Sequence, residues 1–263
     1  MWTKEKSAAA VALVLGLAVA NGGVAAEGSV KDGPGDEGRK FSWSASVSGV
    51  SEYVFRGFAA SQEDPTVQAW LTLNYGIAYA TVWASGADFG NDLNGEAIQN
   101  KEIDYYVGIK PAVGPVTFDL GALFYTYPGA NDDNTAGVDE QDSFELKAAA
   151  NVAPASNVSL GGVVYWTPEY TGQLGEVWTI EGTAGYTLPA VGIFTPTVGG
   201  TLGAAFAEND DVFAPGKDQY TYWNAGLTLA VQKFAFDFRY WDTNIDLGTY
   251  DERFVFAATV TLP

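Results

Sequence analysis

Residues 115–127 read PVTFDLGALFYTY, and the polarity of their side chains alternates along the chain. One parity carries the apolar series Val116, Phe118, Leu120, Ala122 and Phe124. The opposite parity carries the more polar series Thr117, Asp119, Gly121, Leu123 and Tyr125. A period of two is typical of a β-strand with one apolar face, so this stretch predicts a strand.

The same pattern recurs on both sides of this stretch. We count about twelve alternating segments, typically of the roughly 9–11 residues that a tilted membrane strand needs. They are 41–58, 65–75, 77–87, 101–110, 115–127, 142–152, 157–167, 176–187, 194–206, 219–231, 234–242 and 250–262. The segment 77–87 is the weakest, because neither of its faces is clearly more apolar than the other.

Short and long connections alternate between these segments. Tight turns are predicted at 75–76, 111–115, 153–156 and 232–233, and long polar loops at 88–100, 128–141 and 207–218. Outer-membrane barrels sort their connections in this way, with short periplasmic turns and long extracellular loops. The sequence therefore predicts an all-β fold, a transmembrane antiparallel up-and-down β-barrel of about twelve strands. The last strand should pair with the first, because a free sheet edge cannot be hydrated in lipid.

Away from the segment ends, where Lys101, Asp142, Glu176, Asp242 and Glu252 lie, charged residues avoid the apolar face of every segment. This is expected for a face that meets lipid, where a Lys or Arg near the midplane costs roughly 2–4 kcal/mol. The opposite faces carry Glu52, Arg56, Glu102, Asp104, Lys110, Asp119, Glu145, Lys147, Glu181, Asp237 and Arg239. All of these except Glu102 are candidates for lining a constriction of the lumen. Arg56 is the foremost candidate, with Glu52 as its expected partner on the same strand and Asp104 approaching from another strand. Such a charge cluster would either brace the wall of the barrel or form a constriction that selects solutes.

Aromatic residues gather near the ends of the segments, where interfacial girdles belong. The outer set is Tyr53, Phe55, Tyr105, Phe124, Trp166, Phe206, Trp223 and Tyr240, and the inner set is Phe41, Trp43, Tyr75, Tyr79, Tyr186, Phe194 and Phe234. Ordinary cross-strand packing is the alternative explanation of both sets.

The first residues have the composition of a targeting segment. Lys4 and Lys6 precede the apolar run 8–20, and the small residues 24–26 offer a cleavage site, so 1–26 is predicted to be a secretory signal peptide. Residues 27–40 are rich in glycine and charge and predict a flexible periplasmic lead-in. Residues 41–263 form the predicted barrel.

The composition excludes several classes of chemistry. The 263 residues include no histidine and no cysteine, so a Ser-His-Asp triad, a thiolate nucleophile and Cys- or His-ligated metal sites are ruled out. We expect no enzymatic activity, no cofactor and no metal site; a carboxylate pair among Asp132, Asp133, Asp139 and Glu140 is the remote catalytic alternative. The formal net charge of −19 argues against nucleic acid as a partner.

Five short motifs carry a resemblance to a known family. They are SEYVFRG at 51–57, DPTVQ at 64–68, YTYPG at 125–129, YWTPEY at 165–170 and YTYWN at 220–224. In this order and spacing they resemble the TorF-type porins, a proteobacterial outer-membrane family, over roughly residues 44–262. The resemblance implies a β-barrel in the outer membrane of a Gram-negative bacterium, acting as a channel, and supplies no catalytic residues.

The sequence favours a porin-like channel for passive diffusion of ions or small hydrophilic solutes. About twelve strands predict a narrow lumen, between filled barrels of eight strands and open porins of sixteen to eighteen. The inward charges are mainly acidic, which predicts a weak cation preference. The expected partners are outer-membrane lipids, lipopolysaccharide, the transported solutes and the barrel assembly machinery.

Two other interpretations stay open at this stage. A non-conducting structural or surface-binding barrel would use its acidic loops to hold divalent cations or lipopolysaccharide. A soluble up-and-down barrel would place its apolar faces inside instead of outside.

Overall fold

The computed structural model describes residues 28–29, 40–91, 94–131 and 139–263. The predicted signal peptide lies outside the described residues, as do Asp132 and Asp133 of the loop at 128–141. Of the predicted lead-in, the structure describes Gly28, Ser29 and Lys40. Gly28–Ser29 form the short strand β1, which pairs with residues 42 and 43.

Twelve long strands form the wall of the molecule, and each pairs antiparallel with its neighbours. They are β2 (Phe41–Val50), β5 (Thr66–Tyr75), β6 (Ala78–Gly86), β7 (Lys101–Ile109), β9 (Val116–Thr126), β10 (Ser143–Ala155), β11 (Val158–Thr167), β12 (Val177–Thr187), β13 (Thr195–Ala207), β14 (Gln219–Val231), β15 (Phe234–Thr243) and β16 (Arg253–Leu262). Strand β2 pairs with β5 on one side and with β16 on the other, which closes the sheet into a barrel. The predicted fold and strand number are confirmed.

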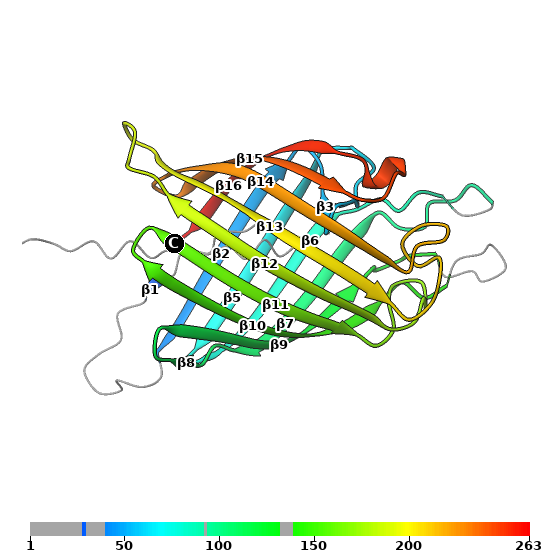
Figure 1. Cartoon of the computed structure of the whole chain (residues 1–263), viewed down its shortest axis with the longest axis horizontal. Coiled ribbons are helices and arrows are strands. Elements are labelled where there is room, and N and C mark those ends of the chain that lie inside the picture. The colour runs from blue at the N-terminus through cyan, green and yellow to red at the C-terminus, as the bar shows by residue number, and fades with distance from the viewer. Residues whose placement is uncertain (1–27, 30–39, 92–93, 132–138) are drawn as a thin grey trace, which may run out of the picture.

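The connections are sorted by length between the two ends of the barrel (Figure 1). Turns at one end are short, as between β5 and β6 or β14 and β15, and the turn before β9 includes the two-residue strand β8 (Ala112–Val113). The other end carries the long loops, including the 3-10 helix η2 (Gly248–Tyr250). No helix of the described residues is long and apolar enough to cross a membrane.

The first predicted segment, 41–58, is wrong in its second half. Strand β2 ends at Val50, and the chain then forms a small hairpin of β3 (Val54–Phe55) and β4 (Phe58–Ala59). The turn residues Arg56 and Gly57 both have positive φ, at 51° and 89°. Two such residues in succession form the tight turn of a two-residue hairpin. The alternation of polar and apolar side chains continues through this turn, so the sequence pattern does not show where the chain reverses.

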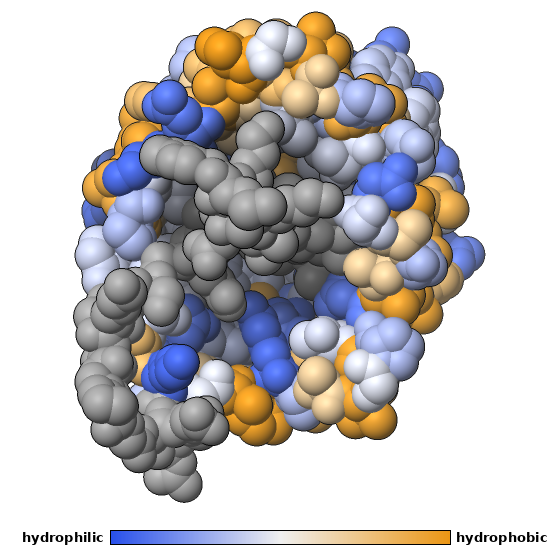
Figure 2. Space-filling view, turned by 90° about the vertical axis from the view of Figure 1, so that its left-hand side faces the viewer, coloured by the Kyte–Doolittle hydropathy of each residue, from blue (hydrophilic) through white to orange (hydrophobic). Residues whose placement is uncertain are grey.

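The two faces of the barrel differ in composition as predicted. Large apolar side chains such as Leu71, Phe124 and Phe254 are exposed on the outside, whereas Ser48, Asp104 and other polar groups are buried inside. Figure 2 looks at the end with the short turns: apolar residues gather around the outer wall, and hydrophilic residues lie within the ring. This distribution is opposite to that of a soluble barrel with an apolar interior.

The structure also shows which face of β6 points outward, a question that the sequence left open. Trp83 and Ser85 are buried inside the barrel, while Ala78, Ala80 and Val82 are exposed on the outer wall. The reason is register: Trp83 pairs with Trp70 on β5 and with Asp104 on β7, and all three point inward. Small alanines on the outer face hid this assignment in the sequence.

Three members of the predicted aromatic girdles point inward instead. Tyr53 is buried against Trp83, and Phe55 packs on Tyr125, because both belong to the segment that leaves the wall after Val50. Tyr79 donates a hydrogen bond of 2.8 Å to Asp119 on the inner face. Most other members are exposed or partly exposed on the wall.

One aromatic pair at the loop end holds a partly exposed carboxylate. The rings of Trp166 and Trp178 lie 6.2 Å apart, and both indole N–H groups donate to Glu176, at 2.7 and 2.9 Å. These two hydrogen bonds lower the pKa of Glu176.

Candidate functional site

Residues 51–62 leave the wall and fold inside the barrel; we call this segment the inward hairpin. Its ends are joined by a hydrogen bond of 2.8 Å from the N–H of Ala60 to the carbonyl of Tyr53. The Oγ of Ser61 accepts from the N–H of Tyr53 and donates to the carbonyl of Asp64. These bonds satisfy the backbone of the hairpin, so it can be buried at low cost.

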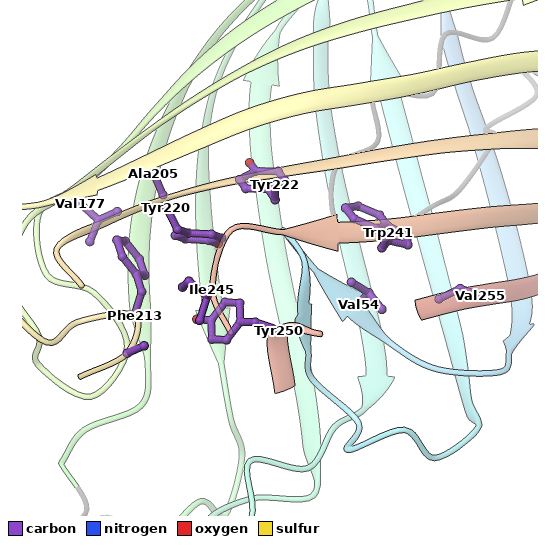
Figure 3. Close-up of a cluster of buried hydrophobic side chains, with 11 residues drawn as sticks. Val54, Val177, Ala205, Phe213, Tyr220, Tyr222, Trp241, Ile245, Tyr250 and Val255 are labelled. Carbon is purple, nitrogen blue, oxygen red and sulfur yellow. The ribbon is translucent and has the colours of Figure 1, made fainter. Parts of the chain in front are cut away.

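The inward hairpin contacts side chains from strands around the whole ring. Phe58 packs against Phe89 and Tyr250 from two of the long loops, and Val54 joins a buried cluster with residues of β12 to β16. Figure 3 shows Val54 near Trp241, with Tyr222 and Tyr250 farther along the same buried cluster. Because its neighbours come from opposite sides of the ring, the hairpin lies across the lumen near the loop end.

Arg56 at the tip of the hairpin pairs with the far wall. Its guanidinium makes two hydrogen bonds of 2.9 Å, one to each carboxylate oxygen of Glu145 on β10. The Nε atom lies 4.0 Å from Glu181 on β12, and the guanidinium stacks 4.4 Å from the ring of Tyr165 on β11. In strand order β2 and β11 lie on opposite sides of the twelve-stranded ring, so this contact spans the lumen.

The groups around this ion pair complete its hydrogen bonding. Tyr125 and Thr167 donate to Glu145, at 3.0 and 2.9 Å, and Tyr222 donates to Glu181 at 2.5 Å. Tyr220 donates to the backbone carbonyl of Arg56 at 3.0 Å. A buried, two-point arginine–carboxylate pair with satisfied neighbours is geometrically specific, and removing one partner alone is costly.

The expected pair of Glu52 and Arg56 does not form. Glu52 instead pairs with Arg253 on β16 at 2.5 Å, and Arg253 also donates to the carbonyls of Gly248 and Asp251. The reason is the hairpin turn, which carries Arg56 away from the wall that holds Glu52. Asp104 does not contact Arg56 in any ion pair that the structure describes.

Two further ion pairs lie closer to the short turns. Lys147 contacts Asp119 at 2.8 Å, with the hydroxyl of Tyr79 on the other carboxylate oxygen. Arg239 makes two hydrogen bonds of 2.9 Å to Asp237, which is only two residues away on β15. The remaining candidate, Lys110, is exposed in the turn after β7, with its ammonium 4.7 Å from the ring of Tyr79.

Sequence reasoning missed two kinds of inner residue. Arg253 lies on the polar face of the last strand, so the alternation of that strand was sufficient to predict that its side chain points inward. The inner tyrosines Tyr165, Tyr220 and Tyr222 were not singled out, because aromatic residues were assigned to girdles. The available signal was their parity, which is opposite to that of Trp166 and Trp223 on the same strands.

Among the residues that the structure describes, no group of three or more Asp, Glu, His or Cys side chains is arranged to hold a metal ion. The acidic loop residues Asp139 and Glu140 are exposed. The site joins Arg56 and Glu145 across the interior of the barrel, among buried aromatic and charged side chains.

A bacterial family described as "protein of unknown function (Gcw_chp)" matches residues 36–262. No curated protein matches the sequence. Among solved structures, a KdgM porin is similar, with a TM-score of 0.54, 7% identity and coverage of 84% of this chain and 99% of the porin. A NanC porin is similar with a TM-score of 0.52, 12% identity and coverage of 83% and 99%. At these identities the likeness concerns the fold.

Proposed function

We propose that this chain, which belongs to the Gcw_chp family of bacterial proteins, is a non-enzymatic porin-like channel in the outer membrane. The observation that carries the proposal is the reversal of the usual protein interior. Exposed apolar side chains cover the outer wall of a closed sheet, and buried polar and charged groups line its inside. In a closed barrel the backbone N–H and C=O groups of every strand are hydrogen-bonded to neighbouring strands, as hydrocarbon requires. This distribution of side chains also leaves a polar path through the middle.

The likeness to porins supports the same function, since the fold of the KdgM and NanC porins covers most of this chain. The orientation follows from the connections: the short turns face the periplasm and the long loops face outward. Lipids and lipopolysaccharide would contact the wall, and assembly would use the barrel machinery of the outer membrane. In its finer form, the proposal is that this chain is a porin of the TorF type.

The inward hairpin makes the channel narrow. It crosses the lumen near the loop end and is held by the pair of Arg56 and Glu145, so solutes must pass beside it or displace it. This arrangement favours inorganic ions and small hydrophilic solutes over large ones. Of the two sequence-based interpretations of Arg56, bracing of the wall and constriction of the lumen, the cross-lumen contact supports the second.

The balance of inner charges supports a weak cation preference. Arg56, Lys147, Arg239 and Arg253 each pair with a carboxylate. Glu102 and Asp104 are buried and are in none of the ion pairs of the described residues. Since the unpaired charge of the lumen wall is acidic, it attracts cations.

Electrical recording of the refolded protein in a planar bilayer tests this proposal. We expect discrete single-channel steps of small conductance and, across a potassium chloride gradient, a reversal potential of the sign that indicates cation preference. A reversal potential of opposite sign would refute the cation preference but not the channel itself.

A non-conducting barrel is the alternative that the same hairpin supports, because its buried contacts fill the loop end of the lumen. Insertion without any conductance steps would favour this alternative, with the acidic loops as the binding surface. Calcium-dependent shifts in melting temperature that depend on those loops would support it further.

A further inference from the structure

Five buried polar atoms of the described residues lack a hydrogen-bond partner along one pair of strands. They are Nε1 of Trp83, Oε1 and Nε2 of Gln99, Oε2 of Glu102 and Oδ1 of Asp104. Trp83 on β6 is the direct cross-strand neighbour of Asp104 on β7, and Gln99 lies two residues before the start of β7. Unpaired buried polar atoms are rare in native structures, and a group of them indicates a missing water or ion.

Glu102 and Asp104 lie side by side on the inner face of β7. Only 2% of Glu102 and none of Asp104 is exposed, and the two carboxyl groups interact directly. Tyr106 donates to one oxygen of Asp104 at 2.5 Å, and Tyr127 donates to one oxygen of Glu102 at 3.4 Å. Apart from the contact between the two carboxyl groups, Oε2 of Glu102 and Oδ1 of Asp104 accept no hydrogen bond of ordinary geometry from the described residues.

No basic side chain of the described residues forms an ion pair with either acid. The ion pairs of the described residues use Glu52, Asp119, Glu145, Glu181 and Asp237, and they include neither Glu102 nor Asp104. Two adjacent buried carboxylates without a counter-charge carry a large desolvation cost in addition to their repulsion. A positive partner from outside the chain would remove both costs.

We propose that Glu102 and Asp104, together with the side-chain carbonyl of Gln99, bind a hard metal cation of the Ca²⁺ type. Carboxylate and amide oxygens are the ligands that Ca²⁺ takes, and water or backbone carbonyls supply its remaining positions. The sealed position of the two acids suits a single ion better than an organic solute. The site is inside the barrel, and so it is distinct from the acidic outer loops.

The proposed ion would also hold the inward hairpin. Tyr53 of the hairpin packs on Trp83 with ring centroids 5.4 Å apart, and Trp83 is the direct cross-strand neighbour of Asp104. The cation therefore couples to the part of the chain that narrows the lumen.

Binding is measured on the refolded full chain in detergent micelles after treatment with a chelator. Calorimetric titration with Ca²⁺ should give one site that is stronger than the background binding of the acidic loops. Replacement of both acids, as Glu102→Gln with Asp104→Asn, should weaken that site by about tenfold or more, since affinity follows the number of charged ligands. The variant Glu252→Gln, which removes an exposed loop acid, is the matched control and should leave the site unchanged.

Terbium luminescence gives a second readout, because Tb³⁺ replaces Ca²⁺ and is excited by a nearby indole. Trp83→Phe should abolish most of the sensitised emission while calcium binding persists. Circular dichroism verifies that each variant folds; removing the charges relieves repulsion, so the double variant should fold. All of these measurements are independent of channel activity.

Two outcomes would overturn the proposal. Calcium binding of equal strength in the wild type and in the double variant would place the bound ions on the outer loops. A wild type that binds no calcium above the loop background would mean that a shared proton or buried water satisfies the two acids.

Discussion

Single residues at the tip of the inward hairpin make the contacts that fix its position across the lumen. Arg56 reaches a carboxylate that lies 89 positions away in sequence, and both of its hydrogen bonds are fully buried. The sequence placed Arg56, Glu145 and Glu181 on inner faces, and in the structure all three are buried inside the barrel. It did not identify which of them pair, because that depends on the path of the hairpin across the lumen, and parity along a strand contains no information on that path.

The pair of Arg56 and Glu145 is tested by removing each partner. Arg56→Ala should destabilise the folded barrel by about 3–5 kcal/mol, because it leaves the carboxylate of Glu145 buried without a counter-charge. In urea titrations the double variant Arg56→Ala with Glu145→Gln should be less destabilised than the sum of the single variants. Strict additivity would contradict a direct pair. Conductance of Arg56→Ala should also exceed that of the wild type.

Gly57 is tested by adding a single methyl group. At its φ of 89° any other residue is strained, and a Cβ would lie 2.4 Å from the Cγ2 of Thr243. Gly57→Ala should therefore cost about 1–3 kcal/mol from backbone strain, together with the clash. Adding Thr243→Ser removes the clashing methyl group and keeps the hydroxyl, so the double variant should recover part of the loss. Full wild-type stability of Gly57→Ala would contradict this geometry.

At the scale of whole elements, the alternating pattern was a reliable guide. Eleven of the segments match barrel strands to within a few residues at each end, since parity is enforced wherever one face is apolar. The exception is the segment at 41–58, where the alternating pattern runs through a turn. The weak pattern of β6 reflects its outward alanines, which separate the two faces poorly.

The outward face of β5 offers a matched test of the lipid interface. Leu71 is exposed on the outer wall, and its neighbour Thr72 points inward and bonds to Thr81. In lipid vesicles Leu71→Arg should destabilise the folded barrel by about 2–4 kcal/mol, and Thr72→Arg should cost less. Equal costs in urea titrations would indicate that the outer wall does not face hydrocarbon.

On the scale of the whole molecule, closure and face polarity act together. The pairing of β16 with β2 was predictable, because a sheet in lipid cannot leave an edge unpaired. The filling of the loop end was not, since it depends on contacts between the inward hairpin and residues from nearly every strand. A closed wall with a polar interior and a folded-in segment is what the proposed narrow channel requires.

The most direct test compares single-channel conductance of the wild type with that of a variant whose hairpin is trimmed. Residues 54–59 are replaced by Gly-Gly. Two residues are enough to close this loop, because Tyr53 and Ala60 are already joined by a backbone hydrogen bond. We predict that both proteins insert and conduct, and that the trimmed variant has a severalfold larger conductance. Equal conductance, or none in either protein despite insertion, would contradict a lumen narrowed by the inward hairpin.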